Sequence, residues 1–167
     1  MLISMSVLLI AALGFFTGLR TFTPIAVLCW FAYMHMLLFT GWRNFTASLI
    51  AVILFTAAAL GEYIGDKLPK TPSRLSAMGL GARAVLGALC GLLLAQPLAF
   101  AWPLAILTGA VGGVAGSYIG YFIRTRAVRA LRSPDWPVAV VEDIVTIAGS
   151  IFTLHIAGTV GAIVSLS

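Results

Sequence analysis

The sequence predicts an all-α, polytopic membrane protein with six transmembrane helices, and two observations support this prediction. Hydrophobic residues make up 61% of the 167 residues and charged residues only 9%, whereas soluble domains average roughly 45–50% and about 25%. The apolar residues also form long runs that glycine, proline and basic residues separate. A soluble fold of this length could not bury so much apolar surface, and a disordered chain has low hydrophobicity and high charge. Both of those classes are excluded.

Six apolar segments have about the length of 20 residues that a spanning helix needs. They cover about residues 2–19, 24–41, 45–66, 75–95, 98–123 and 137–164. The first segment lacks the basic region and the cleavage site of a signal peptide, so we assign it as the first transmembrane helix. Pro24 and Pro137 begin the second and sixth segments. Proline lacks a backbone N–H, and it is tolerated in the first turn of a helix because the N–H groups there have no intrahelical partner.

Short, breaker-rich turns connect these segments. Only Gln96 and Pro97 separate the fourth segment from the fifth, so these two helices must form a close antiparallel hairpin. We therefore expect one transmembrane domain over residues 1–167, built from helix hairpins at about 1–41, 44–95 and 98–165.

The charged residues predict the orientation in the membrane. Nine of the ten basic residues lie in or beside the turns that follow the first, third and fifth segments: Arg20, Lys67, Lys70, Arg74, Arg83, Arg124, Arg126, Arg129 and Arg132. By the positive-inside rule these turns are cytoplasmic and both termini face outward. The net charge of +5 is thereby explained without a nucleic-acid partner.

Three segments share a G-x-aromatic-x-G motif, which occurs as Gly14-Phe-Phe-Thr-Gly18, Gly61-Glu-Tyr-Ile-Gly65 and Gly116-Ser-Tyr-Ile-Gly120. Small residues four positions apart let membrane helices approach closely, so we expect packing seams here. Lining of a substrate path is the alternative. The recurrence also favours three hairpins related by a pseudo-threefold axis along the membrane normal, as in the parallel repeats of some transporters. Chance matches among 17 glycines would give the same pattern.

Other reactive side chains give weak signals. Cys29 and Cys90 lie inside apolar runs, which is typical of buried free thiols. His35 and His155 have no partner at metal-ligand spacing, so no metal site and no cofactor are predicted. Because no nucleophile, base and orienting group can be named together, we do not expect an enzyme.

The candidate site is a group of charged residues that lie at similar depth near the cytoplasmic face: Arg20, Glu62, Asp66, Arg83, Glu142 and Asp143. Glu62 and Asp66 are four positions apart and share one helix face. Glu142 and Asp143 are adjacent and diverge by about 100°, so they cannot aim at the same point. A carboxylate in a membrane helix should face the bundle interior, a cavity or a cation, and the two arginines are the obvious counter-charges.

Several of these residues belong to motifs that resemble a known family. The motifs are Gly18-Leu-Arg20-x-x-x-Pro24, Glu62-x-x-x-Asp66-Lys67-x-Pro69 and the pair Glu142-Asp143 at the start of the last helix. Together they resemble bacterial integral membrane proteins that are catalogued as domain of unknown function 4126. The resemblance covers most of the chain and implies a location in the bacterial inner membrane. It implies no activity.

Two functions agree with this pattern. The first is a small transporter or channel-like protein, in which the carboxylates bind an ion, a proton or a small solute and the arginines fix their ionisation. The second is a non-transporting scaffold or lipid-interacting protein, in which the charges form a structural ion-pair network. Expected partners are membrane lipids and the unknown solute or ion, and a homodimer is compatible with both. A wet cavity around the charges would favour the first function, and direct pairs at about 3 Å would favour the second.

Overall fold

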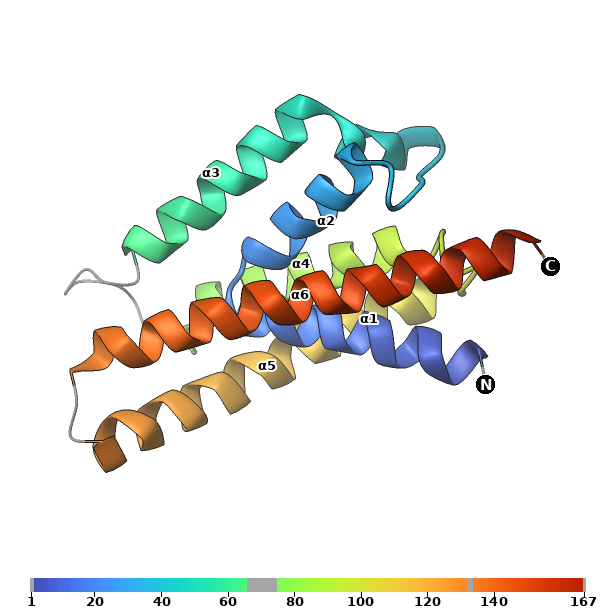
Figure 1. The fold of residues 1–167 in the computed structure, drawn as a ribbon. Coiled ribbons are helices and arrows are strands. Elements are labelled where there is room, and N and C mark those ends of the chain that lie inside the picture. The colour runs from blue at the N-terminus through green and yellow to red at the C-terminus, as the bar shows by residue number, and fades with distance from the viewer. Residues whose placement is uncertain (1, 66–74, 132–133, 167) are drawn as a thin grey trace.

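The computed structural model describes residues 2–65, 75–131 and 134–166, and within these ranges the regular secondary structure is helical. The helices follow in the order α1 (Leu2–Leu19), α2 (Thr23–Tyr33), the 3-10 helix η1 (Gly41–Ala47), α3 (Leu49–Gly65), α4 (Ala77–Leu94), α5 (Trp102–Leu131) and α6 (Asp135–Leu166). The start of α1 and the end of α6 lie at one end of the bundle, which we call the terminal end (Figure 1). The all-α class is confirmed.

Length and composition allow α4, α5 and α6 to cross a membrane, and α3 gives a fourth span if it is counted together with η1, from which it is bent by 61°. Among the described residues, α1 and α2 are shorter apolar helices. With 11 residues, α2 is about 16 Å long, roughly half of a bilayer's hydrocarbon core. Six spans are therefore not confirmed, although the protein has the long apolar helices of a membrane protein.

The second segment was expected to continue to residue 41, but its helix ends at Tyr33. Two residues later, His35 adopts a left-handed conformation with a φ of 58°. The N–H groups of Met36 and Leu37 then donate to the Phe31 carbonyl at 2.9 and 3.3 Å. A residue in the left-handed conformation, usually glycine, commonly ends a helix, and His35 has this conformation here. The hydropathy of the segment did not predict that the helix would end at this point.

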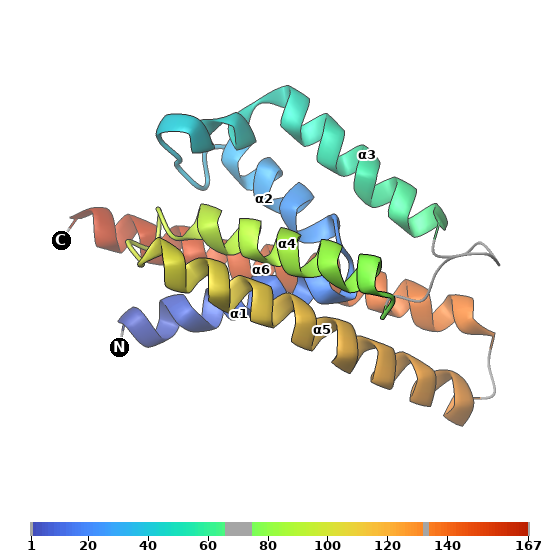
Figure 2. The same cartoon turned by 180° about the vertical axis from the view of Figure 1, so that it is seen from behind.

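The helices pack as a tight group of α1, α4 and α5, with α6 lying across α1 and α2. The expected α4–α5 hairpin is present, and Phe100 N–H donates to the Ala95 carbonyl at 2.9 Å in its turn. Helix α3 packs on α2 and η1, and it diverges from α4 in both views (Figures 1 and 2). The main partners of α1 are thus α5 and α4, which come from the other predicted hairpins.

Glycines make the tight packing of α1 on α5 possible. A Cβ on Gly18 would stand 2.5 Å from the Ser117 nitrogen and 2.6 Å from the Gly116 Cα. By contrast, a Cβ on Gly61 or Gly65 would have no atom within 4 Å. The packing seam is therefore present for the first and third motifs but, among the described residues, not for the second. Because the three motifs are not equivalent, the threefold repeat is not confirmed.

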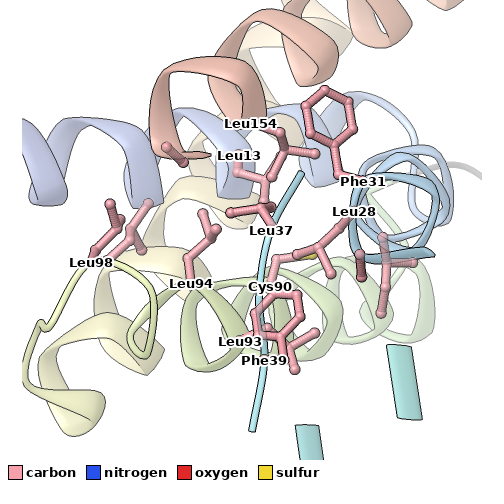
Figure 3. Close-up of a cluster of buried hydrophobic side chains, with 14 of the residues drawn as sticks. Leu13, Leu28, Phe31, Leu37, Phe39, Cys90, Leu93, Leu94, Leu98 and Leu154 are labelled. Carbon is pink, nitrogen blue, oxygen red and sulfur yellow. The ribbon is translucent and has the colours of Figure 1, made fainter. Parts of the chain in front are cut away.

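The apolar core lies in the half of the bundle toward the terminal end. It joins α1, α2, the chain after α2, α4 and α6 (Figure 3), and its labelled members are Leu13, Leu28, Phe31, Leu37, Phe39, Cys90, Leu93, Leu94, Leu98 and Leu154. Cys29 and Cys90 are both fully buried free thiols, which confirms the sequence-based expectation. Apart from Arg43, which lies in η1, the charged side chains of the described residues gather at the opposite end, which we call the charged end (Figure 1).

Candidate functional site

Arg20 is the most deeply buried charge of the site. It directly follows α1, and its N–H still donates to the Phe16 carbonyl at 2.9 Å. The side chain is only 2% exposed, and its Nε lies 2.6 Å from Oδ1 of Asp143 on α6. The guanidinium carbon also lies 5.6 Å from the ring centroid of Tyr63 on α3, within the range of a cation–π contact. Arg20 therefore joins the end of α1 to two other helices.

Glu62 on α3 caps the start of α2. Its two carboxylate oxygens accept hydrogen bonds from the Thr21 N–H at 2.8 Å and the Phe22 N–H at 3.0 Å. Phe22 is the N-cap residue of α2 and its own side chain makes no capping bond. The Phe22 N–H is one of the groups that the start of a helix leaves without an intrahelical partner, and a carboxylate from another helix accepts its hydrogen bond. The negative charge also faces the positive end of the α2 dipole. Arg83 Nη2 completes the arrangement at 3.8 Å from Glu62 Oε1.

Tyr63 connects these two groups. Its hydroxyl shares a 2.7 Å hydrogen bond with Oγ1 of Thr23, the first residue of α2, while its ring contacts Arg20. We call the set Arg20, Glu62, Tyr63, Arg83 and Asp143 the charged junction. It joins α1, α3, α4 and α6 around the start of α2.

Tyr63→Phe is expected to destabilise the protein by about 0.5–1.5 kcal/mol, because it removes one partly buried hydrogen bond and keeps the aromatic ring. Thermal unfolding of the detergent-solubilised protein measures this. Tyr118→Phe is the matched control, since the Tyr118 side chain is exposed. If Tyr63→Phe is as stable as the unmodified chain, the Tyr63 hydroxyl does not stabilise the charged junction.

A second ion cluster connects α5 to α6, and we call it the Arg124 cluster. Arg124 binds both oxygens of Asp135, with Nε 2.8 Å from Oδ1 and Nη2 in contact with Oδ2. Its Nη1 lies 3.3 Å from Glu142 Oε2. Glu142 is 9% exposed, whereas Asp135 is 57% exposed. The cluster thus runs from the α6 start into a more buried position.

The structure brings four of the six predicted site residues together: Arg20 with Asp143, and Glu62 with Arg83. Glu142 is directed to the Arg124 cluster instead, as the divergence of adjacent helix positions requires. Asp66 lies outside the described residues.

Sequence reasoning did not select Tyr63, Arg124 or Asp135 for the site. Asp135 and Glu142 are seven positions apart and therefore share a face of α6, a signal that could have linked them to one arginine.

A cavity of about 410 Å³ opens at the terminal end, opposite the charged junction. It is lined by the chain after α2, the α4–α5 turn and the end of α6, including His35, Gln96 and Gly158. Its wall is fixed by Gln96, whose amide oxygen accepts from the Thr40 N–H at 3.0 Å and whose amide nitrogen donates to the Thr40 hydroxyl. We call this space the terminal cavity.

Comparison with known proteins gives one match. The family model described as Domain of unknown function (DUF4126) matches residues 7–167, which is nearly the whole chain. No curated protein and no solved structure matches the chain.

Proposed function

Because the chain belongs to the DUF4126 family, whose description assigns no activity, we propose its function from the charged junction. In this proposal the protein is a scaffold-type or lipid-interacting membrane protein, and its charges form a structural ion-pair network. The observation that carries the proposal is that Glu62 uses both oxygens to cap α2. A carboxylate engaged in this way is a structural ligand of the backbone rather than an open ion site.

The contacts of Arg20 support the same role. Its pairing with Asp143 is direct, at 2.6 Å, and the arginine side chain is 2% exposed. At this separation the two opposite charges are in direct contact and form a salt bridge. In the proposed protein the Arg20–Asp143 pair joins α1 to α6. The contacts of Glu62 with Arg83 and of Tyr63 with Arg20 attach the α2–α3 unit to the α1–α4–α5–α6 group at the charged end.

We further propose that all six α-helices lie in the bacterial inner membrane, with the charged end in the cytoplasm and both termini outside. The position of Asp143 agrees with this, because it lies about 35 Å along α6 from Leu166, close to the hydrocarbon thickness of about 30 Å. The charges then lie near the cytoplasmic boundary. The short helix α2 is tolerated because Glu62 satisfies N–H groups at its start, as the membrane environment demands.

Glu62→Gln tests the proposal. Glutamine keeps one oxygen acceptor but loses the negative charge and one capping bond, so we expect a loss of about 1–2 kcal/mol in stability. Thermal unfolding and solute flux in proteoliposomes are measured on the same preparation. Arg129→Gln, a change at an exposed charge outside both ion clusters, is the control and should leave stability and flux unchanged. A folded Glu62→Gln protein that lacks a flux shown by the unmodified chain would contradict the structural role.

Transport is the second candidate, and the terminal cavity favours it. A cavity open at the terminal end, with closed ion pairs at the other end, is the arrangement of a transporter that faces outward. In that case the inner gate would consist of Glu62, Asp143 and their arginines. Glu142 would influence the gate through its charge. The same flux measurement decides, because Glu62→Gln and Glu142→Gln would then alter a specific flux while the protein stays folded.

A further inference from the structure

A shallow, open groove runs along the exposed side of the α1–α5 pair. Its volume is about 600 Å³, and it is lined by Leu8, Ala11 and Phe15 on α1 and by Leu107, Val111 and Ala115 on α5, among others. The groove exists because small residues let the two helices pack backbone to backbone: a Cβ on Gly112 would stand 2.6 Å from the Ala11 carbonyl oxygen. Its apolar walls fit a hydrocarbon chain.

One stripe of α5 continues from this groove to the charged end. Residues at spacings of three and four share a helix face, and this stripe contains Thr108, Val111, Ala115, Tyr118, Phe122, Arg126 and Arg129. Helical side chains point back toward the helix N-terminus, which here means toward the groove. The Arg126 guanidinium follows this rule and lies 4.7 Å from the Phe122 ring centroid. The stripe therefore offers an apolar groove, aromatic rings and two cations in sequence.

The two cations are available on this face. Both Arg126 and Arg129 are exposed, and within the described residues neither forms an ion pair. The carboxylates that lie closest along the chain, Asp135 and Glu142, are occupied by Arg124, which lies on another face of α5. The stripe thus ends in a positive patch without an internal counter-charge among the described side chains.

We propose that an anionic phospholipid of the cytoplasmic leaflet binds along this stripe, with its acyl chain in the groove and its phosphate between Arg126 and Arg129. The dimensions agree: Phe122 lies about 10 Å from Ala115 and about 16 Å from Val111 along the helix, and one leaflet is about 15 Å thick. Tyr118 is 51% exposed and lies on the stripe between the groove and the cations, about 6 Å along the helix from Phe122. The proposal rests on the membrane orientation proposed above and not on the role of the charged junction.

The test is retention of phosphatidylglycerol by the purified full chain, measured by native mass spectrometry from mixed phosphatidylglycerol and phosphatidylcholine micelles. Each basic residue near an anionic surface contributes about a factor of five. The double variant Arg126→Gln/Arg129→Gln should therefore hold phosphatidylglycerol roughly 25-fold more weakly, with no change for phosphatidylcholine. The charge-preserving variant Arg126→Lys/Arg129→Lys should retain most of the preference. An unchanged preference in the glutamine variant would overturn the proposal.

A second variant tests the groove. Val111, which is 58% exposed, is replaced by tryptophan to fill it, and weaker retention of phosphatidylglycerol by a chain of unchanged oligomeric state is expected. If this variant instead converts a dimer to a monomer, the groove is an interface between two copies and the proposal is wrong. Displacement of the lipid by inorganic phosphate alone would show a free-anion site and would also overturn it. None of these outcomes depends on the stability or flux of Glu62→Gln.

Discussion

Replacing Arg20 with methionine is expected to destabilise the folded protein by about 3–5 kcal/mol, the usual cost of removing one partner of a buried ion pair. Methionine fills much of the space of the arginine stem, so the loss is chiefly electrostatic. It leaves the Asp143 carboxylate, which is 13% exposed, without its closest counter-charge. Unfolding of the detergent-solubilised protein by heat or by sodium dodecyl sulfate measures the change.

Two further variants isolate the pair. In Arg20→Met/Asp143→Leu both charges are absent, and we expect most of the stability to return, because apolar replacement of a whole buried pair is often close to neutral. Arg129→Met, at an exposed position, is the control and should change stability by less than about 0.5 kcal/mol. If the double variant is no more stable than Arg20→Met, the interaction between Arg20 and Asp143 is not the source of the effect.

The charged end was predictable because charges are rare in membrane helices and must meet one another. Arg20 and Asp143 followed from that argument and do pair. The role of Glu62 did not, since its two hydrogen bonds go to backbone N–H groups of residues 21 and 22. Those groups are free only because α1 ends at Leu19 and α2 begins at Thr23. Capping across helices depends on where helices break in space, and periodicity does not give that.

The fate of Glu142 shows a related limit. Helix geometry predicted that Glu142 and Asp143 point in different directions, but not which arginine each would meet. Glu142 pairs with Arg124, which lies 18 residues earlier and across the α5–α6 connection. The predicted fifth segment ends at about residue 123, so Arg124 was expected just beyond the helix, whereas α5 continues to Leu131. The added turns put Arg124 alongside α6 rather than in the loop.

Gly18→Leu is expected to destabilise the protein by about 3 kcal/mol or more, because the new side chain would have to enter the contact between α1 and α5. Even a Cβ there would stand 2.5 Å from the Ser117 nitrogen and 2.6 Å from the Gly116 Cα. These are backbone atoms of a packed helix, so relief requires the helices to separate, and overpacking of this kind costs about 1–3 kcal/mol or more. Thermal unfolding and the yield of folded protein in the membrane measure the effect.

Gly61→Leu is the matched control, since it alters the first glycine of the same motif on α3, where a Cβ would meet no atom within 4 Å. Leucine has a higher helix propensity than glycine by nearly 1 kcal/mol, so this variant should be as stable as the unmodified chain or more so. The contrast separates close helix packing from the mere presence of G-x-x-x-G. Equal damage from both substitutions would mean that α3 also has a close helical partner at Gly61, which none of the described residues provides.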